Sequence, residues 1–121
     1  MSAVASILSI ILFLAFLTSG IQKVLFNPLA SQSAGHLGFS KSAFQRIGMV
    51  EIAGGVAVMA GLAAKGTSFW AILNEIAAGG LMITMILAVY FHVRKGDDMK
   101  VFAPAAGLAV LALLELIFRL A

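Results

Sequence analysis

Long apolar segments alternate with short polar connections along the chain. Four such segments cover about residues 3–26, 44–64, 68–93 and 101–120. Each reaches the length of about 20 residues that a helix rising 1.5 Å per residue needs to cross about 30 Å of hydrocarbon. Unpaired backbone groups are costly in hydrocarbon, and the alternating strands of a barrel are absent from the sequence. The pattern therefore predicts an all-α fold, an integral membrane bundle of four transmembrane helices in a single domain over residues 1–121.

The first apolar segment is expected to be a retained helix and not a cleaved signal peptide. It has no basic residue ahead of its apolar core, and it is longer than the core of a typical signal. It also runs directly into Gln22 and Lys23, which are polar residues of the same predicted helix.

The connections carry local helix signals. Asn27 followed by Pro28 is typical of an N-cap and the first position of a helix, so we expect a short helix at the membrane surface over residues 28–34. Ser40 is a suitable cap for the second transmembrane helix. Residues 65–67 leave room only for a tight turn, which makes the second and third transmembrane helices antiparallel neighbours.

Composition supports a membrane exterior. Hydrophobic residues make up 62% of the chain and charged residues 11%, whereas a soluble domain carries about 25% charged residues. The absence of cysteine excludes disulfides, thiol catalysis and thiolate metal sites. The net charge of +3 does not indicate a nucleic-acid partner, because basic residues beside membrane helices usually set orientation.

The basic residues are distributed unevenly between the two sides of the predicted bundle. Of the eight, only Lys65 and Arg119 belong to the side of the chain termini. The other side holds the remaining six: Lys23, Lys41, Arg46, Arg94, Lys95 and Lys100. Since cytoplasmic connections are rich in Lys and Arg, we expect a multi-pass membrane protein with both termini outside.

An inner set of polar residues interrupts the apolar segments near one boundary. It contains Gln22, Lys23, Glu51 and His92. An ionisable group inside a membrane helix costs about 2.5–3.5 kcal/mol on insertion scales, so each is a functional candidate. Lys23 can pair with Glu51, and His92 can titrate near neutral pH. In the alternative, Lys23 extends to the headgroups, His92 lies at the interface, and Arg46 or Lys23 merely neutralises Glu51.

Small residues flank these charges. Gly48 and Gly55 share a helix face with Glu51, and Ser19 and Gly20 hold the matching positions beside Lys23. Small residues at such positions allow two helices to approach closely or leave room for a ligand.

An outer set contains Asn74, Glu75, Glu115 and Arg119. Glu115 and Arg119 are four residues apart and can pair along one helix. Glu75 and Glu115 reach similar depths, and two nearby carboxyls can share a proton. A packing network near the interface, with no ligand, explains the same residues.

One face of the third transmembrane helix connects the two sets. Asn74, Ala78, Met85 and His92 fall on it, since 18 residues make five turns. This stripe can line a pocket or passage, or it can be a packing seam. Methionine adapts to lipophilic ligands such as a quinone. The candidates for acid–base chemistry are therefore Glu51, His92, Lys23 and Glu75. The candidates for ligand binding are Gln22, Asn74, Glu115 and Met85.

Several familiar cofactor signatures are missing. The sequence has no P-loop, dinucleotide-binding glycine motif or nucleophile elbow. Two scattered histidines, His36 and His92, do not indicate haem or a metal centre. No intrinsic cofactor and no metal site are expected, and a redox role would require a diffusible quinone.

Four motifs follow one another along nearly the whole chain: Gly20-Ile21-Gln22-Lys23, Leu37-Gly38-Phe39-Ser40, the segment 47–55, and the segment 91–97. Their order and spacing resemble those of the DoxX-like family of small bacterial membrane proteins. Lys23, Glu51 and His92 match the polar signature of the family, and Asn74 and Glu75 match it less clearly. The resemblance implies a four-helix bundle in the inner membrane of a bacterium. Some relatives are subunits of a thiosulfate:quinone oxidoreductase, some are accessory proteins in oxidant resistance, and distant relatives are assembly factors.

Three functions remain open from the sequence. The first is binding of a lipophilic molecule such as a quinone, as an accessory redox component with Lys23, Glu51 and His92 at its site. The second is cofactor-independent acid–base catalysis, such as isomerisation, epoxide opening or cyclisation. The third is a scaffold or assembly role in which the polar groups only hold helices together. Expected partners are the lipid bilayer, a lipophilic small molecule, and a second copy of the chain or a membrane redox protein.

Overall fold

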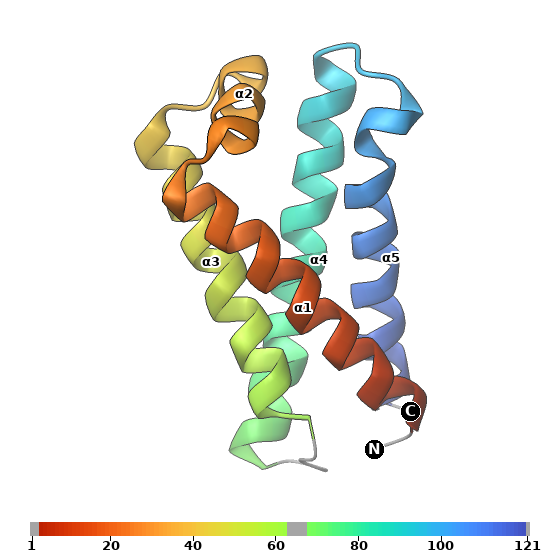
Figure 1. Cartoon of the computed structure of the whole chain (residues 1–121). Helices are drawn as coiled ribbons and strands as arrows, with labels where there is room; N and C mark the ends of the chain where they lie inside the picture. Colours follow the sequence, from red (N-terminus) through yellow and green to blue (C-terminus); the bar gives the residue numbers. More distant parts are fainter. Residues whose placement is uncertain (1–2, 63–67, 121) are drawn as a thin grey trace.

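The computed structural model describes residues 3–62 and 68–120 and is helical throughout this part of the chain, apart from short connections. Four long helices form a bundle, and one short helix lies at its end (Figure 1). Helix α1 begins and helix α5 ends at the opposite end of the bundle from α2 (Figure 1). The helices are α1 (Ala3–Leu25), α2 (Pro28–Leu37), α3 (Lys41–Ala60), α4 (Phe69–Arg94) and α5 (Met99–Leu120).

The four long helices are long and apolar enough to cross a membrane. Large apolar side chains cover the outside of the bundle as well as its core. Leu14, Val50, Ile83 and Val110, one from each long helix, are all more than half exposed. A water-soluble monomer rarely exposes so much contiguous apolar surface. The predicted class, an all-α membrane bundle of four transmembrane helices, is confirmed.

Capping residues set the limits of the helices where hydropathy alone misplaces them. Helix α3 begins three residues before the expected 44, because the Ser40 hydroxyl accepts a hydrogen bond from the Ala43 N–H at 3.1 Å. Helix α2 starts at Pro28 as expected, with Asn27 accepting from the Ala30 N–H at 2.9 Å. It continues to Leu37, beyond the expected end at 34, and stops at Gly38, which adopts φ +82°.

Helix α3 ends at Ala60, earlier than the expected 64. The last residues of that expected helix, 63–64, and the expected turn at 65–67 lie outside the described residues. Helix α4 begins after Ser68, whose hydroxyl accepts from the Ala71 N–H at 3.3 Å.

Helices α1 and α3 approach each other closely at two glycines. A Cβ atom on Gly20 would lie 2.6 Å from the Gly48 carbonyl oxygen, and one on Gly48 would lie 2.7 Å from the Gly20 carbonyl oxygen. Real side chains do not fit at such distances, so the contact exists because both residues are glycine. The small residues beside Lys23 and Glu51 thus bring the two helices together.

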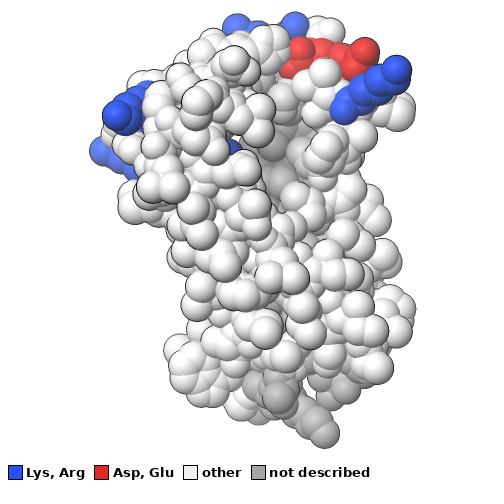
Figure 2. Space-filling view, in the orientation of Figure 1, with Lys and Arg blue, Asp and Glu red and all other residues white. Residues whose placement is uncertain are grey.

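Among the described residues, the basic side chains other than Arg119 lie toward the end of the bundle that carries α2. Figure 2 shows Lys and Arg on this end and an uncharged surface below them. Between the elements, α1 packs against α3 and α5, α4 packs against α3 and α5, and α2 contacts α1 and α3. The core between the long helices contains Leu12, Phe16, Val58, Leu81 and Met85.

A candidate ligand-binding cavity

A cavity of about 790 Å³ opens at the end of the bundle near α2. All five helices contribute to its wall, and the surface is hollowed at this end (Figure 2). Its volume falls in the range of about 300–1,000 Å³ that is typical of small-molecule sites. Most of the wall is apolar. The polar and charged side chains in the wall are Ser19, Gln22, Lys23, Ser33, Arg46, Glu51, Thr84 and His92.

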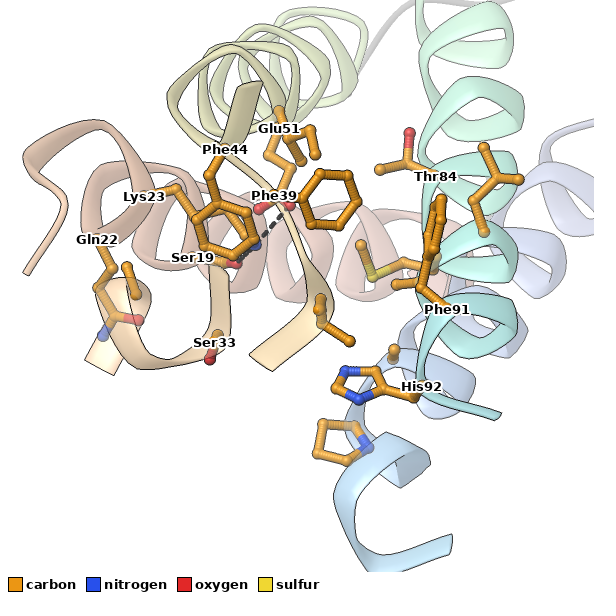
Figure 3. Close-up of a pocket in the computed structure, with 18 of the residues that line it drawn as sticks. Ser19, Gln22, Lys23, Ser33, Phe39, Phe44, Glu51, Thr84, Phe91 and His92 are labelled. Atoms are coloured by element: carbon orange, nitrogen blue, oxygen red, sulfur yellow. Dashed lines mark hydrogen bonds and ion pairs between the residues drawn. The ribbon is translucent and has the colours of Figure 1, made fainter. Parts of the chain in front are cut away.

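Lys23 and Glu51 form an ion pair in the wall of this cavity (Figure 3). The Lys23 Nζ atom lies 2.6 Å from Glu51 Oε1 and donates to the Ser19 hydroxyl at 2.7 Å. It also lies 5.4 Å from the centre of the Phe44 ring. Ser19 reaches Lys23 because the two are four residues apart on α1. Of the two partners that the sequence allowed for Glu51, the one found is Lys23, and the Arg46 residue is exposed.

Glu51 is fully buried, and only one of its two carboxylate oxygens is satisfied. Oε2 is buried and has no hydrogen-bond partner among the described residues. A buried acceptor without a donor is costly, so native structures rarely keep one unless water, an ion or a ligand completes it. Glu51 is one of the residues that line the largely apolar cavity, so the wall contains a residue with an unused hydrogen-bond acceptor.

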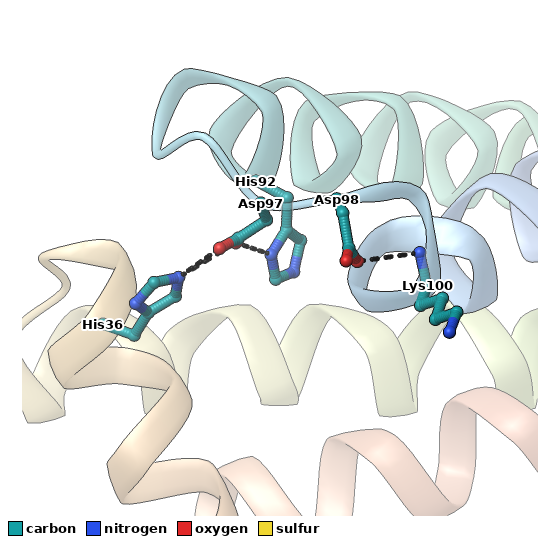
Figure 4. A network of polar contacts seen from close by, with 5 residues as sticks. All are labelled: His36, His92, Asp97, Asp98 and Lys100. Carbon is teal, nitrogen blue, oxygen red and sulfur yellow. Dashed lines mark hydrogen bonds and ion pairs between the residues drawn. The ribbon is translucent and has the colours of Figure 1, made fainter.

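His92 lies across the cavity from the ion pair, on α4 (Figure 3). Its Nδ1 atom lies 2.7 Å from Asp97 Oδ2, and the Nε2 atom of His36 lies 2.8 Å from Asp97 Oδ1 (Figure 4). Asp97 belongs to the turn between α4 and α5, whereas His36 belongs to α2. One carboxylate thus joins the end of α2 to the end of α4 beside the cavity.

The hydrogen bond from His92 is the main reason why the pKa of Asp97 lies below its usual value of 3.8, and His36 lowers it further. Desolvation opposes both effects. Because the carboxylate is favoured in the folded protein, its stabilising effect is complete above the unfolded value and disappears as the pH falls through the folded pKa.

We expect thermal unfolding of the detergent-solubilised protein to show this dependence below pH 3.8, and Asp97→Asn to remove it. Asp98→Asn is the matched control, because among the described residues the Asp98 carboxylate accepts only from the Lys100 backbone N–H, at 3.1 Å. Equal acid sensitivity of the wild type and Asp97→Asn would contradict the assignment.

The outer polar set lies away from the cavity. Glu115 is buried and accepts a hydrogen bond from the Ser9 hydroxyl at 2.8 Å. Asn74 is also buried, and its side-chain N–H donates to the Val58 carbonyl at 2.7 Å. Glu75 is half-buried. None of the three candidates Asn74, Glu75 and Glu115 lines the cavity.

The stripe along α4 therefore divides into two parts. Met85 and His92 line the cavity, whereas Asn74 and Ala78 are buried in the packed core. The structure brings together Gln22, Lys23, Glu51, Met85 and His92 of the expected site residues. No member of the outer set is among the described residues that line this cavity.

Sequence reasoning missed the polar partners of the site. Ser19 was visible only as a small neighbour of Lys23, although its spacing of four predicts the contact. Asp97 belongs to the polar turn after α4. The chain turns back toward His92 at Gly96, which adopts φ +80°. His36 is 61 residues from Asp97, so no local pattern predicts their contact.

Fold and site together define the class of protein. It is a four-helix membrane bundle with a paired lysine and glutamate in the wall of a cavity near one end. A sequence profile of the DoxX-like family matches residues 7–114, and the chain belongs to this family. The match includes Lys23, Glu51 and His92. Comparisons with curated proteins and with solved structures gave no match.

Proposed function

We propose that the cavity binds a lipophilic small molecule with a hydroxylated ring, a quinol or its quinone, and that the protein is an accessory redox component in the membrane. The observation that carries this proposal is the unpaired Oε2 atom of Glu51 in the wall of a largely apolar cavity. A carboxylate oxygen can only accept a hydrogen bond, so a ligand group that pairs with Oε2 must be a hydrogen-bond donor.

Lys23 supplies the complementary group. An ammonium has three N–H donors, and Glu51 and Ser19 take two of them. The third can donate to a ligand oxygen. A head group with a hydroxyl donor and an oxygen acceptor, as in a quinol, matches this pair, whereas a quinone offers acceptors only. The aromatic side chains Phe39 and Phe91, whose ring centres are 5.1 Å apart, offer an apolar wall for the ring or tail.

His92 gives the cavity a second group for proton handling. Oxidation of a quinol to a quinone releases two protons and two electrons, so a carboxylate and an imidazole in one cavity suit the proton side of that reaction. We propose that a separate membrane redox partner exchanges the electrons.

Glu51→Gln is expected to weaken binding of decylubiquinol by about 10- to 100-fold, since a hydrogen bond to a charged group is worth about 1.5–3 kcal/mol. The substitution puts an amide N–H, a donor, where a carboxylate oxygen can accept. Binding of decylubiquinone should fall less or rise, which shifts the preference of the site from the quinol toward the quinone. Calorimetry on protein in lipid nanodiscs measures both affinities.

Glu75→Gln is the matched control, because it neutralises a glutamate that lies outside the cavity. It should leave both affinities unchanged. Equal loss of quinol and quinone binding in Glu51→Gln would indicate a general structural defect, and unchanged quinol binding would remove the proposed site.

We also propose that the cavity faces the cytoplasm of a bacterium from its inner membrane, with both chain termini outside. Six of the eight basic residues flank the cavity end, which favours this orientation. The chain has no cysteine, so a thiol reagent can label only the cysteine that is introduced. In intact cells an impermeant thiol reagent should label Ser68→Cys and not Lys95→Cys, and the opposite pattern would invert the orientation.

A further inference from the structure

Three buried polar side chains meet in the half of the bundle far from the cavity. Ser9 of α1, Asn74 of α4 and Glu115 of α5 are all fully buried. The Ser9 hydroxyl donates to Glu115 Oε1 at 2.8 Å, and Asn74 donates to the carbonyl of Val58 on α3 at 2.7 Å. All four long helices thus contribute to one polar cluster inside an apolar core.

This cluster has fewer polar hydrogen atoms than hydrogen-bond acceptors. Glu115 Oε2 and Asn74 Oδ1 are both buried and have no hydrogen-bond partner among the described residues. The Ser9 O–H donates to Oε1, and one of the two Asn74 N–H groups donates to Val58. The second Asn74 N–H can complete Oε2 of Glu115 but not Oδ1 of its own amide, so at least one acceptor stays without a hydrogen. An ionised Glu115 accepts only, so it cannot complete the cluster. A proton on the carboxyl turns one of these acceptors into a donor.

Some of the charges around the cluster favour the ionised form of Glu115, and others favour its protonated form. Arg119, one turn away on α5, favours the carboxylate, and Glu75 on α4 favours the protonated form. Helix α1 contributes only the neutral Ser9. Helix α3 presents its C-terminal end, where the helix dipole is negative and favours a bound proton. Arg119 also donates to the Leu62 carbonyl at 3.4 Å, just beyond the end of α3.

We propose that Glu115 is a proton-binding site of the folded protein, occupied at neutral pH and separate from the ligand cavity. The ligand is a proton and not a metal cation, because the described residues contain no group of three or more His, Cys, Asp or Glu side chains that could hold a metal ion. Loss of the proton places a negative charge between α1, α4 and α5. Proton binding at Glu115 therefore stabilises the packing of these three helices.

Infrared spectroscopy of the full chain in lipid bilayers tests the site directly. The wild type at neutral pH should show the C=O stretch of a protonated carboxylic acid, shifted in heavy water. Glu115→Gln should lose this band, and it should still fold, because its amide can both accept from Ser9 and donate toward the cluster. Glu75→Gln and Glu51→Gln should keep the band, which assigns it to one glutamate.

A measurement on the unmodified chain covers the case in which Glu115→Gln does not fold. With carbon-13 in the glutamate carboxyls, the three glutamates should give one protonated resonance at neutral pH. Absence of a protonated carboxyl, or a band that survives Glu115→Gln, would overturn the proposal. Loss of the band on adding sodium chloride at constant pH would overturn it in favour of a cation site.

Discussion

Lys23→Ala is expected to destabilise the folded bundle by about 3–5 kcal/mol, the cost of leaving the buried charge of Glu51 without its partner. Glu51 is fully buried, and its ionic contact at 2.6 Å is with Lys23. Removing the ammonium also removes the donor to Ser19. Reversible unfolding in mixed micelles of dodecyl maltoside and sodium dodecyl sulfate measures the free-energy difference.

Lys100→Ala is the matched control, since this residue is exposed and its recorded hydrogen bond uses the backbone N–H. A surface substitution of this kind should change the stability by less than about 0.5 kcal/mol. Equal stability of the two variants would show that Lys23 does not hold the charge of Glu51.

A double variant separates a structural role of the pair from a binding role. Lys23→Met combined with Glu51→Leu replaces the ion pair with apolar side chains of similar size, a change that is often neutral or stabilising. We expect it to recover most of the stability lost in Lys23→Ala but to bind decylubiquinol no better than Glu51→Gln. Recovery of stability with unchanged quinol binding would leave the pair with a structural role only.

Gly48→Ala is expected to destabilise the bundle by about 1–3 kcal/mol through overpacking. The added Cβ would lie 2.7 Å from both the Gly20 carbonyl oxygen and the Lys23 Cβ atom. The first of these is backbone, so α1 and α3 must separate to admit the methyl group. The same mixed-micelle unfolding measures the loss, and quinol affinity should fall with it because Lys23 moves relative to Glu51.

Gly79→Ala is the control for this substitution. A Cβ atom on Gly79 meets nothing within 4 Å, and alanine favours an interior helix position by about 0.5–1 kcal/mol over glycine. The two substitutions, identical in chemistry, should therefore have opposite signs. Equal effects would mean that the crossing of α1 and α3 is not as close as the structure shows.

The sequence by itself determined the class of the fold. Its four apolar segments are long enough to span a bilayer, and hydrocarbon permits no other backbone solution for them than helices. It also identified Lys23 and Glu51 as unusual. The cost of placing a charge in a membrane helix depends on its depth in the bilayer, and the position of the residue within its apolar segment indicates that depth. The small residues Gly20 and Gly48 marked the helix contact in the same way.

Only the tertiary structure decided which polar groups meet. Helical periodicity assigns a residue to a face, but it does not fix how each helix is rotated or which neighbour it contacts. Ser9 and Glu115 are 106 residues apart, and His36 and Asp97 are 61 apart. Local pattern contains no information on such pairs. The packing of five helices separated the inner cavity, with Glu51, from the buried cluster around Glu115, because apolar side chains such as Leu81 and Phe16 fill the core of the bundle.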